Sequence, residues 1–241
     1  MKKLSADPVY KGIYGSLCIL IHLVAAVQFW YAVYFDHVFV VFATAASFGG
    51  KLKFLTFLDA IIQAVYFTIA LINDFMGTNE VSPKRLPLIR KLKDYMMATF
   101  AFPLALNVGI TFWSIYAIDR ELILPKVLDA VFPSWLNHIM HTNIVVFMIL
   151  EIFTSFRAYP KRGDGMMGLS IFLLAYLVWL HIVKYYSGLW AYPFLELLSL
   201  PQRLLFFIGS LAINWCLYVL GETMNNMIWN KELKMAYRKT N

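Results

Sequence analysis

Charged residues are scarce in this chain. Asp, Glu, Lys and Arg make up 15% of its 241 residues and hydrophobic residues 61%, whereas a soluble domain averages about 25% charged residues. The mean hydropathy is +0.65. This composition excludes an ordinary soluble domain and indicates an integral membrane protein. The net charge is +7, but long apolar runs separate the basic residues. This distribution is typical of the loops of a membrane protein that follow the positive-inside rule and argues against nucleic-acid binding.

Cysteine and histidine are also few, with two cysteines and five histidines. Cys18 and Cys216 lie inside apolar runs without metal-ligand spacing, which is typical of packing residues. His138 and His141 stand one helical turn apart, but the metalloprotease pattern needs a different spacing and an adjacent Glu. No G-x-S-x-G motif occurs, so a soluble-type serine triad has no support. We expect no metal and no cofactor; a metal-dependent lipid enzyme is the lesser alternative.

Apolar runs, by contrast, are abundant. Six are long enough, or nearly so, to cross a hydrocarbon core that needs about 20 residues. The sequence therefore predicts an all-α protein with six transmembrane helices. Pro103 predicts a kink in the third, and the shorter apolar segment 38–48 either extends the first helix or lies at the membrane interface. The predicted spans are residues 12–35, 54–72, 95–116, 135–153, 166–183 and 204–221.

Basic residues are distributed unevenly between the two ends of these spans. With the N-terminus inside, 15 of the 21 basic residues fall on inner loops and tails, as the positive-inside rule requires. Both termini are therefore predicted to be cytoplasmic, in the plasma membrane or the endoplasmic reticulum. No domain boundary is evident, so residues 1–241 are expected to form one transmembrane domain. Residues 73–94 predict a basic cytoplasmic loop, and residues 230–241 a polar, frayed tail.

Polar side chains inside the apolar runs are costly, so they are functional candidates. Thr56 lies in the first turn of the second span and His141 in the second turn of the fourth. Both spans enter from the outer side, which places the two residues at similar depth. Asp59 shares a helical face with Thr56, and Asn137 shares one with His141. The polar set is His22, Thr56, Asp59, Gln63, Asn107, His138, His141, Asn143, Glu151, His181 and Asn214.

A Thr/His pair suits acyl transfer on a lipid substrate. A Thr hydroxyl is a weak nucleophile until a neighbouring base takes its proton, and a neutral imidazole is a natural base. The pattern leaves open whether the two helix faces meet. A non-enzymatic transporter or membrane scaffold is the alternative, because the polar set could line a solute path. The absence of inverted repeats in the sequence argues against a transporter.

Six stretches, taken together, resemble one family. They follow one another along residues 51–229, whereas the first fifty residues and the loop around residues 76–89 carry none of the resemblance. The chain is similar in these stretches to the androgen-induced protein family, also called FAR-17a-like, which includes the androgen-dependent TFPI-regulating proteins. The stretches are KLKFLTFLDAIIQAVYF, FAFPLAL, IYAIDRELILPKVLD, WLNHIMHT, GLWAYPFLE and YVLGETMNNMIW.

The resemblance implies a multi-pass membrane hydrolase of fatty acid esters of hydroxy fatty acids (FAHFA), whose ester joins an acyl chain to a mid-chain carbon. It implies Thr56 of the FLTF-like motif as the nucleophile and His141 of the NHxMHT-like motif as the base. The expected partners are this lipid ester and the surrounding membrane lipids, and the expected process is lipid metabolism. The resemblance implies no oligomeric state.

The remaining roles that the resemblance implies are supporting ones. Asn137, His138 and Thr142 are expected to orient His141 or to donate to an oxyanion. Asp59 is expected to orient the base or to pair with a basic group. The AIDREL and AYPFLE segments are expected to form the outer loops over the site, and a structural role is the alternative for Asp119, Arg120 and Glu196.

Overall fold

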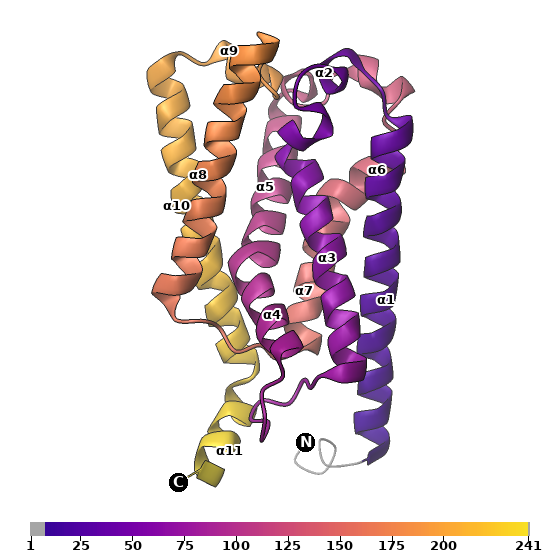
Figure 1. The fold of residues 1–241 in the computed structure, drawn as a ribbon, viewed down its shortest axis with the longest axis vertical. Helices are drawn as coiled ribbons and strands as arrows, with labels where there is room; N and C mark the ends of the chain where they lie inside the picture. Colours follow the sequence, from indigo (N-terminus) through magenta and orange to yellow (C-terminus); the bar gives the residue numbers. More distant parts are fainter. Residues whose placement is uncertain (1–7, 241) are drawn as a thin grey trace.

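Six long helices run the length of the structure, and the connections between them gather at its two ends (Figure 1). The computed structural model describes residues 8–240, with side chains for residues 15–235. All six predicted spans are present, which confirms an all-α, multi-pass integral membrane protein. The helices long and apolar enough to cross a membrane are Gly15–Phe39, Leu55–Met76, Leu88–Ile118, Ser134–Thr154, Arg162–Ser187 and Leu200–Ile228.

Four of the six spans are single α-helices, and the other two are each interrupted by one π-helical turn. Pro103 is the second residue after the first π turn. Because proline lacks the N–H that would bond one turn earlier, the predicted distortion takes the form of a widened turn. The single helices are α1 (Pro8–Phe39), α3 (Leu55–Met76), α8 (Arg162–Ser187) and α10 (Leu200–Ile228). The interrupted spans are α4 (Leu88–Met96), η3 (Met97–Ala101) and α5 (Phe102–Ile118), then α6 (Ser134–His138), η6 (Ile139–Asn143) and α7 (Ile144–Thr154).

The third span begins at Leu88, earlier than predicted. Arg90 and Lys93, expected in a solvated loop, are instead buried in α4. Both have acceptors: Arg90 Nε lies 2.8 Å from the Asp94 carboxylate, and Lys93 Nζ lies 2.8 Å from Asn79 Oδ1. The predicted loop 73–94 was therefore too long, because partnered charges can be carried inside a bundle.

Helices α1, α3, α5 and α7 pack around an apolar core, and α8 and α10 lie side by side on its flank (Figure 1). Phe29, Phe67 and Phe147 meet in this core with ring centroids 5.8–5.9 Å apart. Buried alanines such as Ala64 and Ala105 let the helix backbones approach closely. In the most apolar windows of α8 and α10 only 17% and 22% of residues are buried, against 33–56% in the other spans, so this helix pair is the least enclosed.

The connections at the end opposite α11 (Asn230–Thr240) form a cap over the bundle (Figure 1). Within segment 38–48, two residues extend α1 and the rest folds into a loop that contains α2 (Ala43–Ala46). Lys53 anchors this loop, because its Nζ donates to the Thr44 carbonyl at 2.5 Å and to Ser47 Oγ at 2.6 Å. The cap also contains η2 (Gly50–Lys53), η4 (Arg120–Leu122), η5 (Lys126–Ala130) and α9 (Pro193–Leu197).

The segment expected to be a frayed tail is helical. Residues 230–240 form α11, which is rich in good helix formers such as Glu232, Leu233 and Lys234. The prediction of a frayed tail was therefore wrong. The first turn of α1 and helix α11 lie at the same end of the bundle (Figure 1), as an even number of spans requires.

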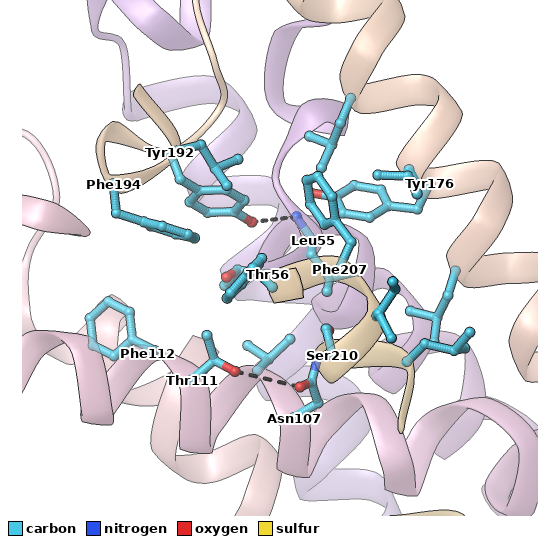
Figure 2. A pocket seen from close by; sticks show the side chains of 18 of the residues that line it. Leu55, Thr56, Asn107, Thr111, Phe112, Tyr176, Tyr192, Phe194, Phe207 and Ser210 are labelled. Atoms are coloured by element: carbon cyan, nitrogen blue, oxygen red, sulfur yellow. Dashed lines mark hydrogen bonds between the residues drawn. The ribbon is translucent and has the colours of Figure 1, made fainter. Parts of the chain in front are cut away.

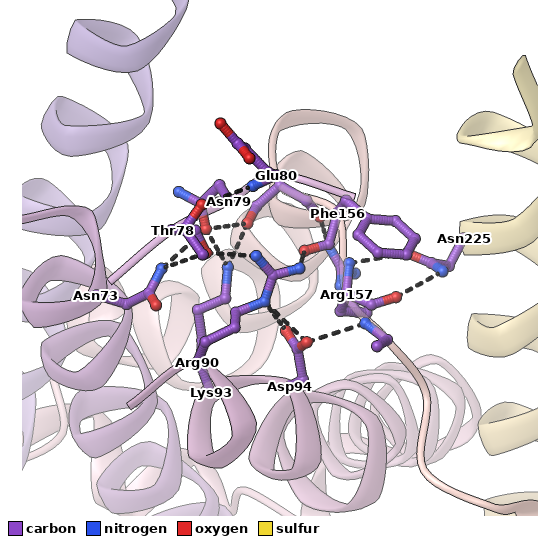
Figure 3. Close-up of polar contacts among 12 residues, drawn as sticks. Asn73, Thr78, Asn79, Glu80, Arg90, Lys93, Asp94, Phe156, Arg157 and Asn225 are labelled. Carbon is purple, nitrogen blue, oxygen red and sulfur yellow. Dashed lines mark hydrogen bonds and ion pairs between the residues drawn. The ribbon is translucent and has the colours of Figure 1, made fainter. Parts of the chain in front are cut away.

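Buried polar side chains form a network in the half of the bundle nearer α11. Figure 3 shows the part of this network around Arg90, Lys93 and Asp94, which Asn79 connects to Asp74. His22 bridges two carboxylates: Nδ1 lies 2.5 Å from Asp74 Oδ2, and Nε2 lies 2.7 Å from Glu151 Oε2. Tyr66 donates to the other oxygen of Glu151 at 2.7 Å. The network thus ties α1, α3 and α7 together. On α3, Tyr66 follows Thr56 by 10 residues and Asp74 follows it by 18, so the network extends from about 15 Å to about 27 Å along the helix from Thr56.

Candidate active site

Thr56 and His141, predicted to lie at one depth, are in direct contact. Thr56 is the second residue of α3, and His141 belongs to the π turn η6. Thr56 Oγ1 lies 3.3 Å from His141 Nε2, slightly beyond the usual range of about 2.7–3.2 Å and common in sites without substrate. The His141 residue is only 5% exposed. Packing therefore brings together the two side chains that the sequence singled out.

The other ring nitrogen of His141 fixes its tautomer. Nδ1 lies 3.0 Å from the backbone carbonyl oxygen of Asn137. Because a carbonyl only accepts, Nδ1 carries the ring proton and Nε2 presents its lone pair to the Thr56 hydroxyl. The geometry is of the kind formed by a nucleophile, a base and an orienting acceptor, with a carbonyl where many hydrolases use a carboxylate.

A close approach of α5 holds the His141 ring in place. Phe112 stacks on it with ring centroids 3.5 Å apart and 13° between the planes. Gly109, one turn earlier, permits this approach, since a Cβ there would lie 2.6 Å from Val145 Cγ2 and 3.0 Å from the His141 carbonyl oxygen. The π turn adds one residue to the helical turn that carries His141, and such turns often occur at functional sites.

Tyr192, which directly precedes α9, joins the cap to the first turn of α3 (Figure 2). Its phenol oxygen accepts a hydrogen bond from the Leu55 amide at 2.7 Å, and Tyr192 lines the same two cavities as Thr56. Burial raises the pKa of the Tyr192 phenol, so the hydroxyl keeps its proton and can donate it to a neighbour. Tyr176 of α8 supports the same turn by donating to the Lys53 carbonyl at 2.8 Å.

Two cavities meet at Thr56. The first, which we call the helix cavity, has a volume of about 210 Å³ and lies between α3, α5, α8 and α10 (Figure 2). The second, which we call the loop cavity, has a volume of about 510 Å³ and lies beneath the cap. Both are lined mainly by apolar side chains, as ligand sites usually are. The residues that line both are Thr56, Phe112, Ile123 and Tyr192.

The other residues singled out from the sequence lie around this pair. Asn137 contributes its backbone carbonyl to His141, as described above. His138 and Thr142 are bonded to each other at 3.2 Å, and His138 is exposed and stacks on Trp113. Asp59 is buried and accepts a hydrogen bond from Gln63 at 2.8 Å. No contact among the described side chains joins Asp59 to His141.

The sequence reasoning missed Gly109, Phe112 and Tyr192 as parts of the site. Tyr192 lies in the AYPFLE segment, which the sequence predicts to form a loop over the site. The motif therefore indicated the place of Tyr192 but not its contact with α3. Gly109 and Phe112 lie within an unbroken apolar run and carry no comparable signal. Two expected loop residues have structural contacts: Arg120 pairs with Asp129 at 2.5 Å, and Glu196 pairs with Lys184 at 2.6 Å.

Comparison with known proteins identifies the relatives of this chain. The profile of the FAR-17a/AIG1-like protein family matches residues 17–226. The chain belongs to this family. The FAR-17a/AIG1-like match begins at residue 17, so it includes most of α1, which the motifs had left outside the resemblance. No solved structure matches the chain.

Several known proteins align with most of the chain. Androgen-induced gene 1 protein from Homo sapiens is 40% identical over 199 residues, covering 80% of this chain and 84% of that protein. The androgen-dependent TFPI-regulating protein from Rattus norvegicus is 35% identical over 191 residues, covering 79% and 83%. A UPF0641 membrane protein from Schizosaccharomyces pombe is 24% identical over 178 residues, covering 73% and 76%.

Proposed function

We propose that this FAR-17a/AIG1-like protein is a membrane-embedded hydrolase of lipid esters, with Thr56 as the nucleophile and His141 as the base. The observation that carries the proposal is the contact of Thr56 Oγ1 with His141 Nε2 at the junction of two apolar cavities. The resemblance to the family supplies the substrate class, fatty acid esters of hydroxy fatty acids. Such an ester has two long chains, and two cavities that meet at the nucleophile accommodate that shape.

In the first half-reaction, His141 Nε2 accepts the Thr56 hydroxyl proton while Oγ1 attacks the ester carbonyl carbon. The tetrahedral intermediate then collapses by breaking the bond between the carbonyl carbon and the alcohol oxygen. His141 returns the proton to that oxygen, which releases the hydroxy fatty acid and leaves an acyl-threonine. A base positioned in this way contributes about 10²–10⁴-fold to the rate.

In the second half-reaction, His141 takes a proton from water, whose oxygen attacks the acyl carbon. The bond to Thr56 Oγ1 breaks, and His141 delivers the proton to Oγ1. The fatty acid leaves and the hydroxyl is restored. The products are therefore one fatty acid and one hydroxy fatty acid for each water consumed.

Tyr192 is the donor we assign to the negative oxygen that forms in each half-reaction. Its oxygen accepts from the Leu55 amide, which polarises the phenolic O–H and strengthens it as a donor. Thr56 also sits in the first turn of α3, where the helix dipole favours developing negative charge. Preorganised donors of this kind are a major source of transition-state stabilisation.

The proposal is tested by lipid ester hydrolysis in membranes that carry the wild-type protein, Thr56→Ala or His141→Ala. We expect each variant to lose about 100-fold or more of the activity while inserting normally. His37→Ala is the matched control, because it removes an exposed imidazole that lines neither cavity, and it should retain near wild-type activity. Near-normal turnover by Thr56→Ala would refute the mechanism.

A covalent probe gives an independent test of the nucleophile. A fluorophosphonate should label the wild-type protein on the peptide that contains Thr56 and should fail to label Thr56→Ala. Labelling of another peptide would assign the nucleophile elsewhere. Solute movement across liposomes without ester hydrolysis would favour the transporter alternative.

A further inference from the structure

The two cavities that meet at Thr56 differ in what surrounds their outer ends. The lining of the helix cavity includes Leu204 and Ile208, which are 55% and 66% exposed on the flank of α10. This surface belongs to a membrane span, so the helix cavity opens toward hydrocarbon. The lining of the loop cavity includes Val41 and Val127, which are 65% and 79% exposed in the cap. The loop cavity therefore opens at the polar end of the bundle.

The charge of the two linings differs in the same sense. The residues that line the helix cavity include no Asp, Glu, Lys, Arg or His in the part of the chain that the structure describes. Its few polar side chains, such as Asn107 and Ser210, are neutral. The loop cavity includes Asp36 and Lys51, paired at 3.0 Å, and the ring of His141. A hydrocarbon chain suits the helix cavity. The hydroxy-acid half of the ester carries a carboxylate and is excluded from this cavity, because burying an unpaired charge is costly.

The proton transfer proposed for His141 also distinguishes the two cavities. His141 lines the loop cavity and is absent from the lining of the helix cavity. In the proposed first half-reaction His141 protonates the leaving alcohol oxygen, so that oxygen must lie within hydrogen-bonding distance of Nε2. The alcohol half then extends into the loop cavity. The acyl half, on the other side of the carbonyl carbon, extends into the helix cavity.

We propose that the helix cavity between α3, α5, α8 and α10 binds the acyl chain that is transferred to Thr56, and that the loop cavity binds the carboxylate-bearing hydroxy-acid half. This assignment rests on the proposed function. Under this assignment, different residues determine the specificity for the two halves of the ester. Residues of α10 select the acyl chain, and residues of the cap select the alcohol. The same geometry predicts how the ester enters the site. Its acyl tail enters the helix cavity from the lipid, and its carboxylate remains at the polar end of the bundle.

The experiment fills one cavity at a time. Ser210→Leu enlarges a side chain that lines only the helix cavity, and Val131→Phe enlarges one that lines only the loop cavity. Each variant is assayed on two ester series: one varies acyl length with a fixed hydroxy acid, and the other varies the hydroxy acid with a fixed short acyl group. Val146→Phe, at a residue 47% exposed on α7, is the control for added bulk.

We expect Ser210→Leu to lower kcat/KM for long-acyl esters by about tenfold or more and to spare short-acyl esters. We expect Val131→Phe to lower kcat/KM for long hydroxy acids to a similar extent and to spare esters of short alcohols. Val146→Phe should change neither series. If either variant inserts poorly, the smaller changes Ser210→Val and Val131→Leu should give the same directions.

The opposite pattern, or equal effects of both variants on both series, would overturn the assignment. Such results leave the proposed function intact, because the wild-type protein would still hydrolyse the esters. If the wild-type protein hydrolyses no ester in either series, or Thr56→Ala retains the activity, the proposed function fails instead. The two failures are therefore distinguishable.

Discussion

The Leu55 amide donates a hydrogen bond to the phenol oxygen of Tyr192 at 2.7 Å. This bond links the segment before α9 to the first turn of α3, across 137 positions of the chain. It places a protonated phenol beside Thr56, at the point where both cavities meet. A loop that follows the fifth span thus joins a candidate site whose other members lie on the second, third and fourth spans.

Tyr192→Phe should therefore lower kcat with little change in KM. The substitution removes the hydroxyl and leaves the ring, so the apolar contacts with Phe54 and Phe194 are preserved. Loss of one oxyanion donor lowers kcat by about 10²–10³-fold in characterised hydrolases, and the proposed role of Tyr192 predicts a loss of about that size. The measurement is steady-state ester hydrolysis. Tyr185→Phe, at a residue 82% exposed, is the control and should be unaffected.

Gly109→Ala should both destabilise the protein and reduce its activity. An added Cβ would meet Val145 and the His141 carbonyl, and overpacking of this kind costs about 1–3 kcal/mol. The displaced π turn would also move the base away from Thr56. The matched control is Gly209→Ala on α10, where nothing lies within 4 Å, and where alanine should be neutral or stabilising by up to about 1 kcal/mol.

The two glycine variants are compared by melting temperature in detergent and by hydrolysis rate. A lower melting temperature for Gly109→Ala with unchanged turnover would show that the α5 contact stabilises the fold without positioning His141. Equal behaviour of the two variants would contradict the role given to Gly109.

His22→Ala should destabilise the protein strongly. It leaves the buried carboxylates of Asp74 and Glu151 without the imidazole that bridges them, and removing one partner of a buried pair costs about 3–5 kcal/mol. The melting temperature should fall, while the turnover of the remaining folded protein should change little, because the network is remote from Thr56. His181→Ala is the control, since His181 is exposed and bonds only locally, to the Leu177 carbonyl.

Both ends of the chain should be reachable from the cytoplasmic side alone. The positive-inside rule predicts this orientation from the excess of basic residues on the tails and inner loops. Epitope tags at the two termini should be stained after selective permeabilisation of the plasma membrane, and a tag inserted after Lys126 in the cap should remain protected if that side faces a lumen. On a plasma-membrane protein the cap tag would be stained on intact cells. Staining of one terminus without the other would contradict six spans.

The sequence predicted much of the site because polar groups are rare in an apolar run. Thr56 and His141 stood out for that reason, and the topology placed them at one depth before any packing was known. Gly109 and Phe112 could not stand out in the same way, since their roles depend on which helix lies against η6. Asp59 lies on the predicted face, yet its partner is Gln63 one turn along the same helix, so a shared face did not bring it to His141.

The number of spans, the class of protein and the depth of the Thr/His pair were determined by the sequence alone, because the hydrocarbon core sets the length and polarity of each segment that crosses it. The tertiary structure decided which faces meet. It stacked Phe112 of α5 on the ring of His141, brought Tyr192 to the first turn of α3, and left two separate cavities at Thr56. Those features depend on helix packing between distant segments, and periodicity along one helix does not specify its neighbour.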